Sequence, residues 1–227
     1  MVNKIIIRHA TLEDIPEILN VENVAWGNEL AATEGMFKSR INTFSYGTFV
    51  SIENNKITGV VVTQLVNYDI KNFSLSWYQA TDNGYIEKTH DNNGKIVYGV
   101  NLSVIPNATK GTGTLLLEEI GKLAIRLNLK FGMLGGRIPD YHLHSDIPVG
   151  EYIKKTIFIN NEKRLMDKEL SFYKNAGLKI VKPIPNYMID ADSLNYGVLL
   201  IWKNPFYYVL KIFPFLKNKF IKIFKID

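Results

Sequence analysis

The stretch that decides the fold is V-I-P-N-A-T-K-G-T-G-T-L-L-L at residues 104–117, where two glycines separate an apolar run from a helix-forming one. Glycine lets a backbone approach a ligand closely, and the first amides of a helix lack intrahelical acceptors. With the helix dipole, the amides of Gly111, Thr112, Gly113 and Thr114 therefore predict an anion site that suits a phosphate. An ordinary capped turn is the alternative reading.

The segments beside this loop predict a strand before it and a helix after it. Residues 95–105 (K-I-V-Y-G-V-N-L-S-V-I) are rich in β-branched and aromatic side chains. After the loop, apolar residues recur at helical spacing, at Leu116, Ile120, Leu123, Ala124 and Leu127. The loop has neither the G-x-x-x-x-G-K-[ST] spacing of a nucleoside triphosphatase nor the three-glycine fingerprint of a dinucleotide fold.

This order of strand, glycine loop and helix resembles the GNAT superfamily of acyl-CoA-dependent N-acetyltransferases, whose signature is V-x-P, then [RQ]-x-x-G-x-[GA], then a helix. In that family the loop binds the pyrophosphate of coenzyme A. The resemblance assigns five loop residues to the cofactor: Lys110, Gly111, Thr112, Gly113 and Thr114. Ala108 stands where the family has Arg or Gln, and the gap after Pro106 is one residue shorter. One side-chain donor is therefore missing.

A second block, L-S-F-Y-K-N-A-G-L at residues 170–178, resembles the family's L-x-x-Y-x-x-x-G-F. The resemblance implies that Tyr173 protonates the departing thiolate. A phenol with a pKa near ~10 is protonated at neutral pH and can give its proton to a thiolate, whose thiol has a pKa of about 8.5. A half-buried aromatic at a helix end is the alternative reading.

The implied mechanism is direct transfer, in which a neutral amine attacks the acetyl carbonyl. The resemblance implies that strand amides at Leu102, Ser103 and Val104 polarise this carbonyl. A base must first take the ammonium proton. Three carboxylates could be this base by residue type alone: Glu22, Asp69 and Glu87. The alternative reading is that each is a solvated surface carboxylate.

The resemblance implies an α/β (α+β) GNAT fold, with a mixed, mostly antiparallel central sheet of about seven strands flanked by helices and splayed between the fourth and fifth strands. Strands are predicted at 4–8, 48–53, 56–65, 95–105, 130–137, 178–181 and 196–202. Thr11 and Asp14 predict a capping box for the first helix, and 29–41 reads as the second. Asn54-Asn55 predicts a hairpin turn. Residues 1–202 form the predicted acetyltransferase domain.

Two segments exceed the minimal family core, at 67–93 and 138–163, and acceptor specificity is expected there. Four residues just past the fifth strand are acceptor-site candidates: Arg137, Asp140, Tyr141 and His142. Asp140 and His142 form a cluster with His144 and Asp146 that has the residue types of metal ligands but reads better as a solvated loop, and no metal is predicted. The blocks at 135–142 and 193–205 resemble the acetyltransferase domain fused to some carbon-nitrogen hydrolases. The 227 residues predict one domain and a tail.

Composition favours a globular enzyme of a reducing compartment. The chain has 46% hydrophobic and 22% charged residues and no cysteine, which excludes a thiol nucleophile and disulfides. No apolar run approaches the ~20 residues of a spanning helix, and no signal-peptide pattern is present. We expect a cytoplasmic protein, with peripheral contact at the inner membrane surface as an alternative.

A basic tail occupies residues 203–227, for which a helix kinked at Pro214 is predicted. It contains six lysines and one acid, so it carries the whole net charge of +5. An apolar stripe is predicted at Val209, Phe213, Leu216, Phe220 and Ile223. Three readings compete: cover for the domain's own surface or a homodimer partner, contact with an anionic membrane, and nucleic-acid binding, which the absence of arginine disfavours.

The leading hypothesis is therefore an N-acetyltransferase that moves an acetyl group from acetyl-CoA to a primary amine of a small molecule or peptide. One rival is a GNAT module that binds acyl-CoA without turnover. Ala108 favours this reading, because it removes one side-chain donor from the phosphate-binding loop. The other is transfer of a longer acyl group, which the sequence does not distinguish. No sequence pattern in the two long segments identifies the acceptor substrate.

Overall fold

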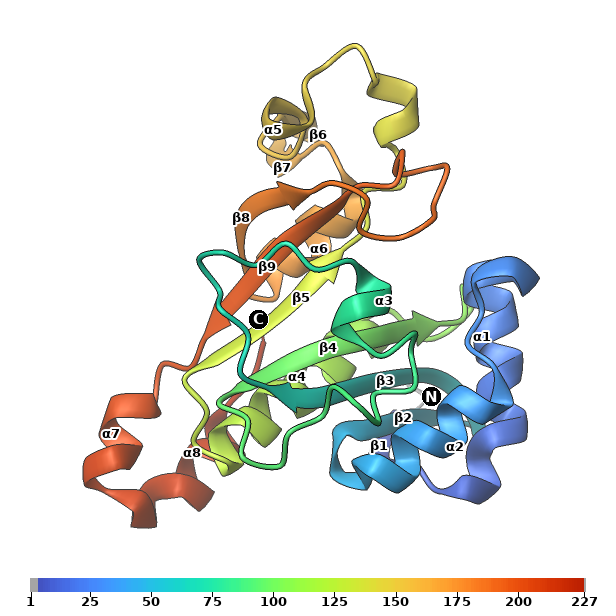
Figure 1. Cartoon of the computed structure of the whole chain (residues 1–227). Coiled ribbons are helices and arrows are strands. Elements are labelled where there is room, and N and C mark those ends of the chain that lie inside the picture. Colours follow the sequence, from blue (N-terminus) through green and yellow to red (C-terminus); the bar gives the residue numbers. More distant parts are fainter. Residues whose placement is uncertain (1–3, 227) are drawn as a thin grey trace.

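A seven-stranded sheet forms the centre of the protein, in the strand order β1-β2-β3-β4-β5-β9-β8 (Figure 1). The computed structural model describes residues 4–226, so the outer ends of the predicted segments 1–202 and 203–227 lie outside the described residues. The strands are β1 (Ile6–His9), β2 (Thr48–Glu53), β3 (Lys56–Val66), β4 (Ile96–Val104), β5 (Phe131–Gly136), β8 (Lys179–Ile184) and β9 (Gly197–Lys203). Among the strands of residues 4–226 that form this sheet, only β4 and β5 pair in parallel. The predicted fold class is confirmed.

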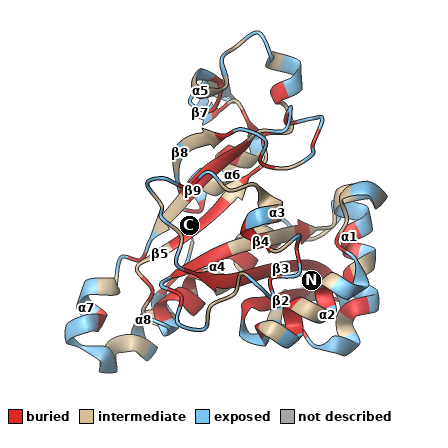
Figure 2. Ribbon diagram, viewed as in Figure 1, coloured by how far each residue is buried: buried red, intermediate tan, exposed pale blue. Residues whose placement is uncertain are grey.

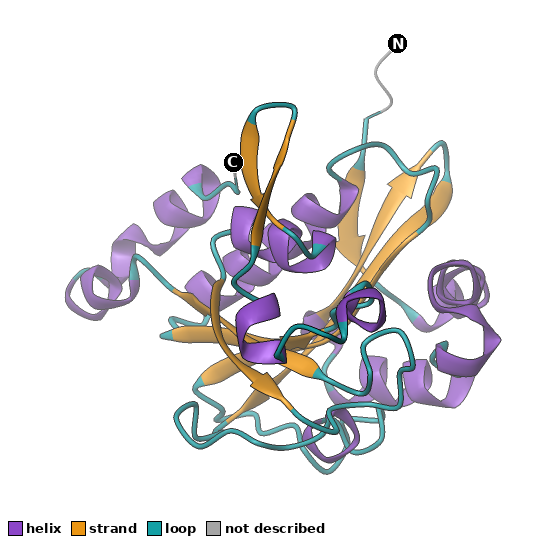
Figure 3. Cartoon of the chain, turned by 90° about the horizontal axis from the view of Figure 1, so that it is seen from above, coloured by secondary structure: helices purple, strands orange, loops and turns teal. Residues whose placement is uncertain are grey.

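Helices cover both faces of this sheet (Figures 1 and 3). They are α1 (Ile15–Leu30), α2 (Glu34–Thr43), α3 (Trp77–Ala80), α4 (Thr112–Arg126), α5 (Val149–Tyr152), α6 (Lys168–Asn175), α7 (Tyr207–Ile212) and α8 (Lys217–Ile223). Four short 3-10 turns accompany them: η1 (Leu12–Asp14), η2 (Ser45–Gly47), η3 (Tyr141–His144) and η4 (Pro214–Leu216). A separate hairpin of β6 (Thr156–Ile159) and β7 (Glu162–Leu165), absent from the prediction, lies in the second long segment.

The sheet splays between β4 and β5, as predicted. The two strands pair at only four positions, from Ile96 opposite Phe131 to Gly99 opposite Leu134. Beyond these pairs β4 continues to Val104 while β5 continues separately. The gap therefore opens toward the carboxyl ends of both strands, which is where the glycine loop begins.

Several local predictions are confirmed at the residues that carried them. Asn54 and Asn55 both adopt positive φ, at 50° and 61°, which is the backbone of a two-residue hairpin turn. Thr11 and Asp14 form the predicted capping box, with the Thr11 amide donating to the Asp14 carboxylate at 2.8 Å.

The predicted second helix began in the wrong place. Residues 29–30 belong to α1, which is interrupted at Gly27, where φ is +69°. The next helix begins only at Glu34, because the Thr33 side chain accepts the Met36 amide and caps it.

The C-terminal tail forms α7, η4 and α8, and the predicted apolar stripe is wrong. Val209, Phe213 and Ile223 are 39%, 46% and 57% exposed. The helix α7 ends at Ile212, just before Pro214, so a single helical stripe does not continue across it. The buried side of the tail instead contains Leu210 and Phe224, which pack against Ile125 of α4. Part of the tail thus covers the domain's own surface. Figure 2 shows the buried strands at the centre and the more exposed α7 at the periphery.

Candidate functional site

The loop between β4 and α4 presents unpaired backbone amides at a helix start. Gly111 caps α4 with φ at +100°, a conformation that favours glycine. Within residues 4–226, the amides of Lys110, Gly111, Gly113 and Thr114 donate to no other protein group. Four donors that face the first turn of a fifteen-residue helix form an anion site.

Gly113 has a second role, because it lets α6 approach the start of α4. A Cβ at this position would lie 3.3 Å from Cζ of Phe172 and 3.8 Å from Cγ2 of Val104. Contacts under about 3.4 Å are tighter than ordinary packing allows. The glycine therefore brings the loop, the end of β4 and α6 to one place.

Glu53, at the end of β2, holds this loop from beneath. Its buried carboxylate accepts the Thr109 amide at 3.1 Å and the hydroxyls of Thr112 and Thr58 at 3.0 Å each. Burial alone would raise the pKa of Glu53, but these hydrogen bonds, led by those from Thr109, hold the pKa below its usual value. Glu53 was missed from the sequence, because it lies 56 residues before Thr109.

Three of the predicted loop residues, Thr112, Lys110 and Thr114, differ in which of their groups a ligand can reach. The Thr112 side chain is 1% exposed and contacts Glu53 and the Thr109 carbonyl, so its hydroxyl faces the protein. Its amide also donates to the Thr109 carbonyl. Lys110 is exposed and Thr114 is half-buried. The ligand-facing donors are therefore the backbone amides and the Lys110 ammonium group.

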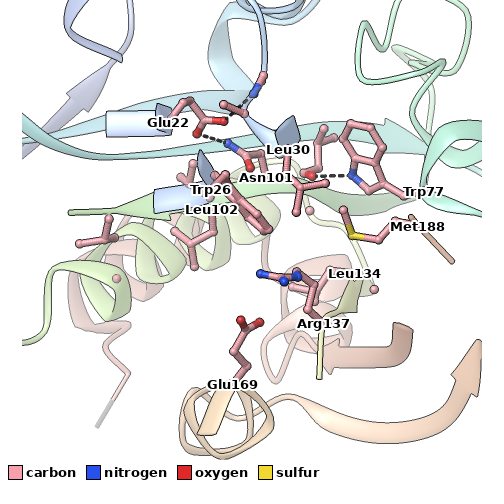
Figure 4. A pocket seen from close by; sticks show the side chains of 18 of the residues that line it. Glu22, Trp26, Leu30, Trp77, Asn101, Leu102, Leu134, Arg137, Glu169 and Met188 are labelled. Carbon is pink, nitrogen blue, oxygen red and sulfur yellow. Dashed lines mark hydrogen bonds between the residues drawn. The ribbon is translucent and has the colours of Figure 1, made fainter. Parts of the chain in front are cut away.

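A cavity of about 440 Å³ runs from this loop through the splay (Figure 4). Gly113 lines it at the loop, and Gly99, Leu102 and Leu134 line it in the gap between β4 and β5. Helices form the other walls, with Glu22 and Trp26 of α1, Trp77 and Tyr78 of α3, and Glu169, Phe172 and Tyr173 of α6 among the lining residues. The anion site and the centre of the splay thus belong to one continuous space.

The end of β4 directs two backbone amides into the gap. The Ile105 amide donates to the Thr58 carbonyl on the β3 side, and Ser103 pairs with Val60 of β3. Because successive residues of a strand face opposite neighbours, Leu102 and Val104 direct their amides away from β3, toward the missing partner strand. The predicted carbonyl-polarising amides at Leu102 and Val104 therefore face the cavity.

Ser103 takes part in a polar network on the α1 side of the site. Its buried hydroxyl donates to the Glu22 carboxylate and accepts from Trp26 Nε1 at 2.6 Å. Glu22 also accepts Asn101 Nδ2 at 2.7 Å and the Ala32 amide at 3.1 Å. Three donors satisfy this 1%-exposed carboxylate, so Glu22 fixes the position of Trp26 and the end of α1.

Tyr173 lies on α6 beside β5, with its ring against Gly136. A Cβ at Gly136 would come within 3.3 Å of the Tyr173 Cε2 atom. The Tyr173 hydroxyl has no hydrogen-bond partner within the described part of the chain, and the residue lines the cavity. Burial, aided by the nearby Glu169 carboxylate, raises the pKa of Tyr173 well above 10. Tyr173 is thus a neutral phenol available to donate.

Glu169 lies one helical turn before Tyr173 and lines the same cavity. Burial raises its pKa to about 7, although the Arg137 guanidinium opposes this shift. Figure 4 shows the Glu169 carboxylate pointing toward Arg137 across the cavity. A carboxylate that titrates near neutral pH can accept a proton and release it again. The sequence reading missed Glu169, although its i−4 spacing from Tyr173 was a usable signal.

Arg137 is the acceptor-site candidate that the structure places in the cavity. Its Nε and Nη2 atoms donate to Asp190 at 2.7 and 2.8 Å, and its guanidinium carbon lies 5.1 Å from the centre of the Trp26 ring. The pairing with Asp190 raises the pKa of Arg137 against the opposing effect of burial. Among the described residues, Nη1 contacts no acceptor. One guanidinium N–H group is therefore free for a ligand.

The other three acceptor candidates lie outside the cavity lining. Tyr141 is buried in the core and donates to the Ile147 carbonyl at 3.0 Å. His142 is exposed beside the Pro139 and Asp192 carbonyls, and Asp140 lies 3.8 Å from Lys168. The chain leaves the site directly after Arg137.

Two of the predicted base candidates and one of the two long segments lie outside the cavity lining. Asp69 is exposed and accepts from Asn72, and Glu87 is exposed, so neither reaches the cavity. The first long segment supplies α3 with Trp77 and Tyr78 to the wall, whereas residues 138–163 supply none of the lining. No group of three or more His, Asp or Glu residues with metal-ligand geometry was found among the described residues.

Comparison with known proteins identifies the family. The chain is 33% identical to the uncharacterized N-acetyltransferase YkwB of Bacillus subtilis over 207 residues, which cover 88% of this chain and 89% of that protein. The chain belongs to the GNAT acetyltransferase family. It is also 31% identical over 205 residues to the probable hydrolase YhcX of Bacillus subtilis, where it spans 39% of the longer protein. This agrees with the resemblance to a domain fused to a hydrolase. No family model matches the sequence.

Solved structures show the same GNAT fold. The loading GNATL domain of CurA from Lyngbya majuscula has a TM-score of 0.78 and 22% identity, over 89% of this chain and 98% of that chain. The GNAT-like decarboxylase GphF, in complex with isobutyryl-CoA, has a TM-score of 0.73 and 23% identity, over 88% of this chain and 99% of that chain. Because both sequence identities are below 25%, these similarities establish only the fold.

Proposed function

We propose that this GNAT protein is an N-acetyltransferase that transfers the acetyl group of acetyl-CoA to a primary amine of a small molecule or peptide. One observation carries the proposal. A single cavity reaches the loop of unpaired amides at Gly113 and is also lined by a neutral phenol, Tyr173, and by a carboxylate of pKa about 7, Glu169. Anion binding, proton donation and proton acceptance are the functions that acyl transfer from a nucleotide thioester to an amine requires.

The residues at the loop fit the diphosphate of coenzyme A. The amides of Gly111, Gly113 and Thr114 would hold its oxygens, and Lys110 is the nearest exposed cation in the loop. The amides of Leu102 and Val104 face the gap that a pantetheine arm would enter. When bound, acetyl-CoA supplies a thioester carbonyl carbon open to attack and a thiolate leaving group.

Two side chains divide the proton transfers of the reaction. Glu169 takes one proton from the ammonium form of the acceptor, which leaves a neutral amine to form the new C–N bond. The Leu102 amide stabilises negative charge on the carbonyl oxygen. As the C–S bond breaks, Tyr173 gives its proton to the sulfur and recovers the second amine proton. Glu169 finally releases its proton to solvent, so protons and charge balance.

The acceptor end of the cavity is formed by the first long segment. Trp77 donates from Nε1 to the Val100 carbonyl at 2.9 Å, and this contact holds α3 against β4. Trp77, Tyr78 and Met188 line the wall there. Aromatic and apolar walls favour an amine with an apolar portion.

The test is a reaction of the purified protein with acetyl-CoA and a panel of primary amines, in which free thiol and acylated amine are both measured. Equal amounts of the two products, dependent on Tyr173, support N-acetyl transfer. Tight binding of acetyl-CoA without turnover of any amine would instead favour the acyl-CoA-binding alternative. A donor panel of increasing chain length tests transfer of a longer acyl group, which the apolar lining by Leu30, Met36 and Met188 supports.

Decarboxylation of a carboxyacyl-CoA is a second candidate, favoured by the free Nη1 of Arg137. A carboxylate on the acyl group could pair with this N–H beside Trp26. Loss of CO₂ would leave its electron pair on the neighbouring carbon, which then takes a proton. The fold neighbour GphF is named as a decarboxylase. Release of CO₂ from malonyl-CoA, absent in Arg137→Met, would support this reaction, and thiol release without CO₂ would exclude it.

A further inference from the structure

The C-terminal segment, residues 203–226, has one side attached to the domain. Phe224 packs so closely on α4 that a Cβ at Gly121 would lie 2.3 Å from its ring. The Phe206 and Phe220 rings stack with their centres 4.3 Å apart, and Leu210 is 2% exposed. This packing gives the segment a fixed position on the molecule.

The other side of the segment leaves large apolar side chains in solvent. We call it the C-terminal apolar face, and it consists of Tyr208, Val209, Ile212, Phe213 and Phe215. Ile212 and Phe215 are 70% and 77% exposed, and the Phe213 and Phe215 rings contact each other. Tyr208, Val209 and Ile212 share one side of α7, because they are spaced by three and four residues. Several large apolar side chains exposed on one short segment are typical of an interaction surface.

Positive charge surrounds this face. Lys203, Lys211, Lys219, Lys222 and Lys225 are exposed, and no acidic residue occurs at 203–226. Its six lysines give the segment a charge of +6, which exceeds the chain's net charge of +5. Lys130, from the turn before β5, adds a further ammonium group 5.6 Å from the centre of the Tyr208 ring.

We propose that the C-terminal apolar face docks on an anionic lipid bilayer. Aromatic and aliphatic side chains would enter the headgroup region while the flanking lysines contact anionic headgroups. No helix among residues 4–226 is long and apolar enough to cross a membrane, so the contact is peripheral. Figure 1 shows α7 and α8 at the end of the molecule away from α1, and Figure 2 shows the largely exposed surface of α7.

Charge and composition favour lipid over the other occupants of such a face. A symmetric dimer through this surface would bring the lysines of two copies together without acidic partners. A nucleic acid would satisfy the lysines but not the aliphatic side chains of Val209 and Ile212, and the segment lacks arginine. An anionic bilayer satisfies both the charge and the apolar surface.

The test is sedimentation of the full chain with vesicles of phosphatidylcholine alone or mixed with phosphatidylserine. We expect binding to the anionic vesicles only, weakened at high salt. The double variant Ile212→Ser/Phe215→Ser should reduce the partition coefficient by about tenfold or more. Lys211→Gln/Lys222→Gln should reduce it by about fivefold per lysine. All four positions are exposed, so folding should be retained.

Phe158→Ser is the matched control, because Phe158 on β6 is 75% exposed and lies in a different element. It should bind vesicles like the unaltered chain. The proposal is overturned if the chain does not sediment with anionic vesicles, or if the double variant and Phe158→Ser bind equally well. It is also overturned if the same double variant abolishes a dimer or a complex with duplex DNA while vesicles remain unbound.

Discussion

Replacing Glu169 with glutamine is expected to remove the base that prepares the amine. Burial places the pKa of Glu169 at about 7, so about half of the population is ionised at neutral pH and competent to accept a proton. Below pH 7 the protonated fraction grows, and the rate under saturating donor should fall about tenfold per pH unit. Glutamine keeps the side-chain shape but does not accept the proton.

The expected loss of turnover in Glu169→Gln follows from the role of Glu169 as a general base. Loss of a positioned general base costs about 10²–10⁴ in rate, so Glu169→Gln should retain about one per cent or less of the turnover at pH 7. Its remaining activity should lack the acidic limb near pH 7. Asp167, Asp190 and Asp140 raise the pKa of Glu169 and Arg137 lowers it. Substitutions at these groups should therefore shift the pH at which activity falls on the acidic side of the pH–rate profile.

The assay is thiol release from acetyl-CoA, followed from acidic to basic pH with the best amine of the panel. Glu29→Gln is the matched control, because Glu29 also lines the cavity but is exposed. An acidic limb near pH 7 that persists in Glu169→Gln, or a rate within about threefold of the unaltered protein, would refute the assignment of the base.

Three further predictions concern the acid, the loop and the tail. Tyr173→Phe should lower turnover by about 10²-fold with little change in acetyl-CoA affinity; because the pKa of Tyr173 is raised well above 10, activity should show no loss from its ionisation up to pH 10. Glu53→Gln should lower the free energy of unfolding in urea by about 1–3 kcal/mol at neutral pH, because one of the two oxygens that accept from Thr109, Thr112 and Thr58 becomes an NH2 donor facing those donors. The pKa of Glu53 lies below 4.5, so its contribution should disappear as pH falls through that lowered pKa, and a constant difference in acid would contradict this. Gly121→Leu should displace Phe224, cost about 1–3 kcal/mol in thermal unfolding and expose the tail to protease. Gly150→Ala, where a Cβ meets nothing within 4 Å, is the control.

The parts of the site that the sequence predicted are those encoded locally. Gly111 and Gly113 lie within a few residues of the strand and helix they join, so one short sequence pattern was enough to predict the anion-binding loop. The family resemblance named the amides of Leu102, Ser103 and Val104; those of Leu102 and Val104 face the cavity, whereas Ser103 pairs with Val60 of β3. Tyr173 came from a family resemblance and occupies the cavity, but its role as the acid stays a prediction.

The missed or misplaced residues depend on contacts between distant segments. The importance of Glu169 comes from burial opposite Arg137 and β5, and Glu53 reaches the loop from β2. Asp140, Tyr141 and His142 were expected beside the acceptor, yet the chain turns outward there, where the His142 amide donates to the Asp192 carbonyl. No sequence spacing specifies that turn.

We propose above all that the β4–α4 loop and the splay together hold an acyl-CoA between the Leu102 amide and Tyr173. A crystal structure with coenzyme A bound tests it most directly. We expect the diphosphate at the amides of Gly111, Gly113 and Thr114, with the sulfur in the cavity within reach of the Tyr173 hydroxyl. A diphosphate bound elsewhere, or a sulfur outside the gap between β4 and β5, would contradict the account.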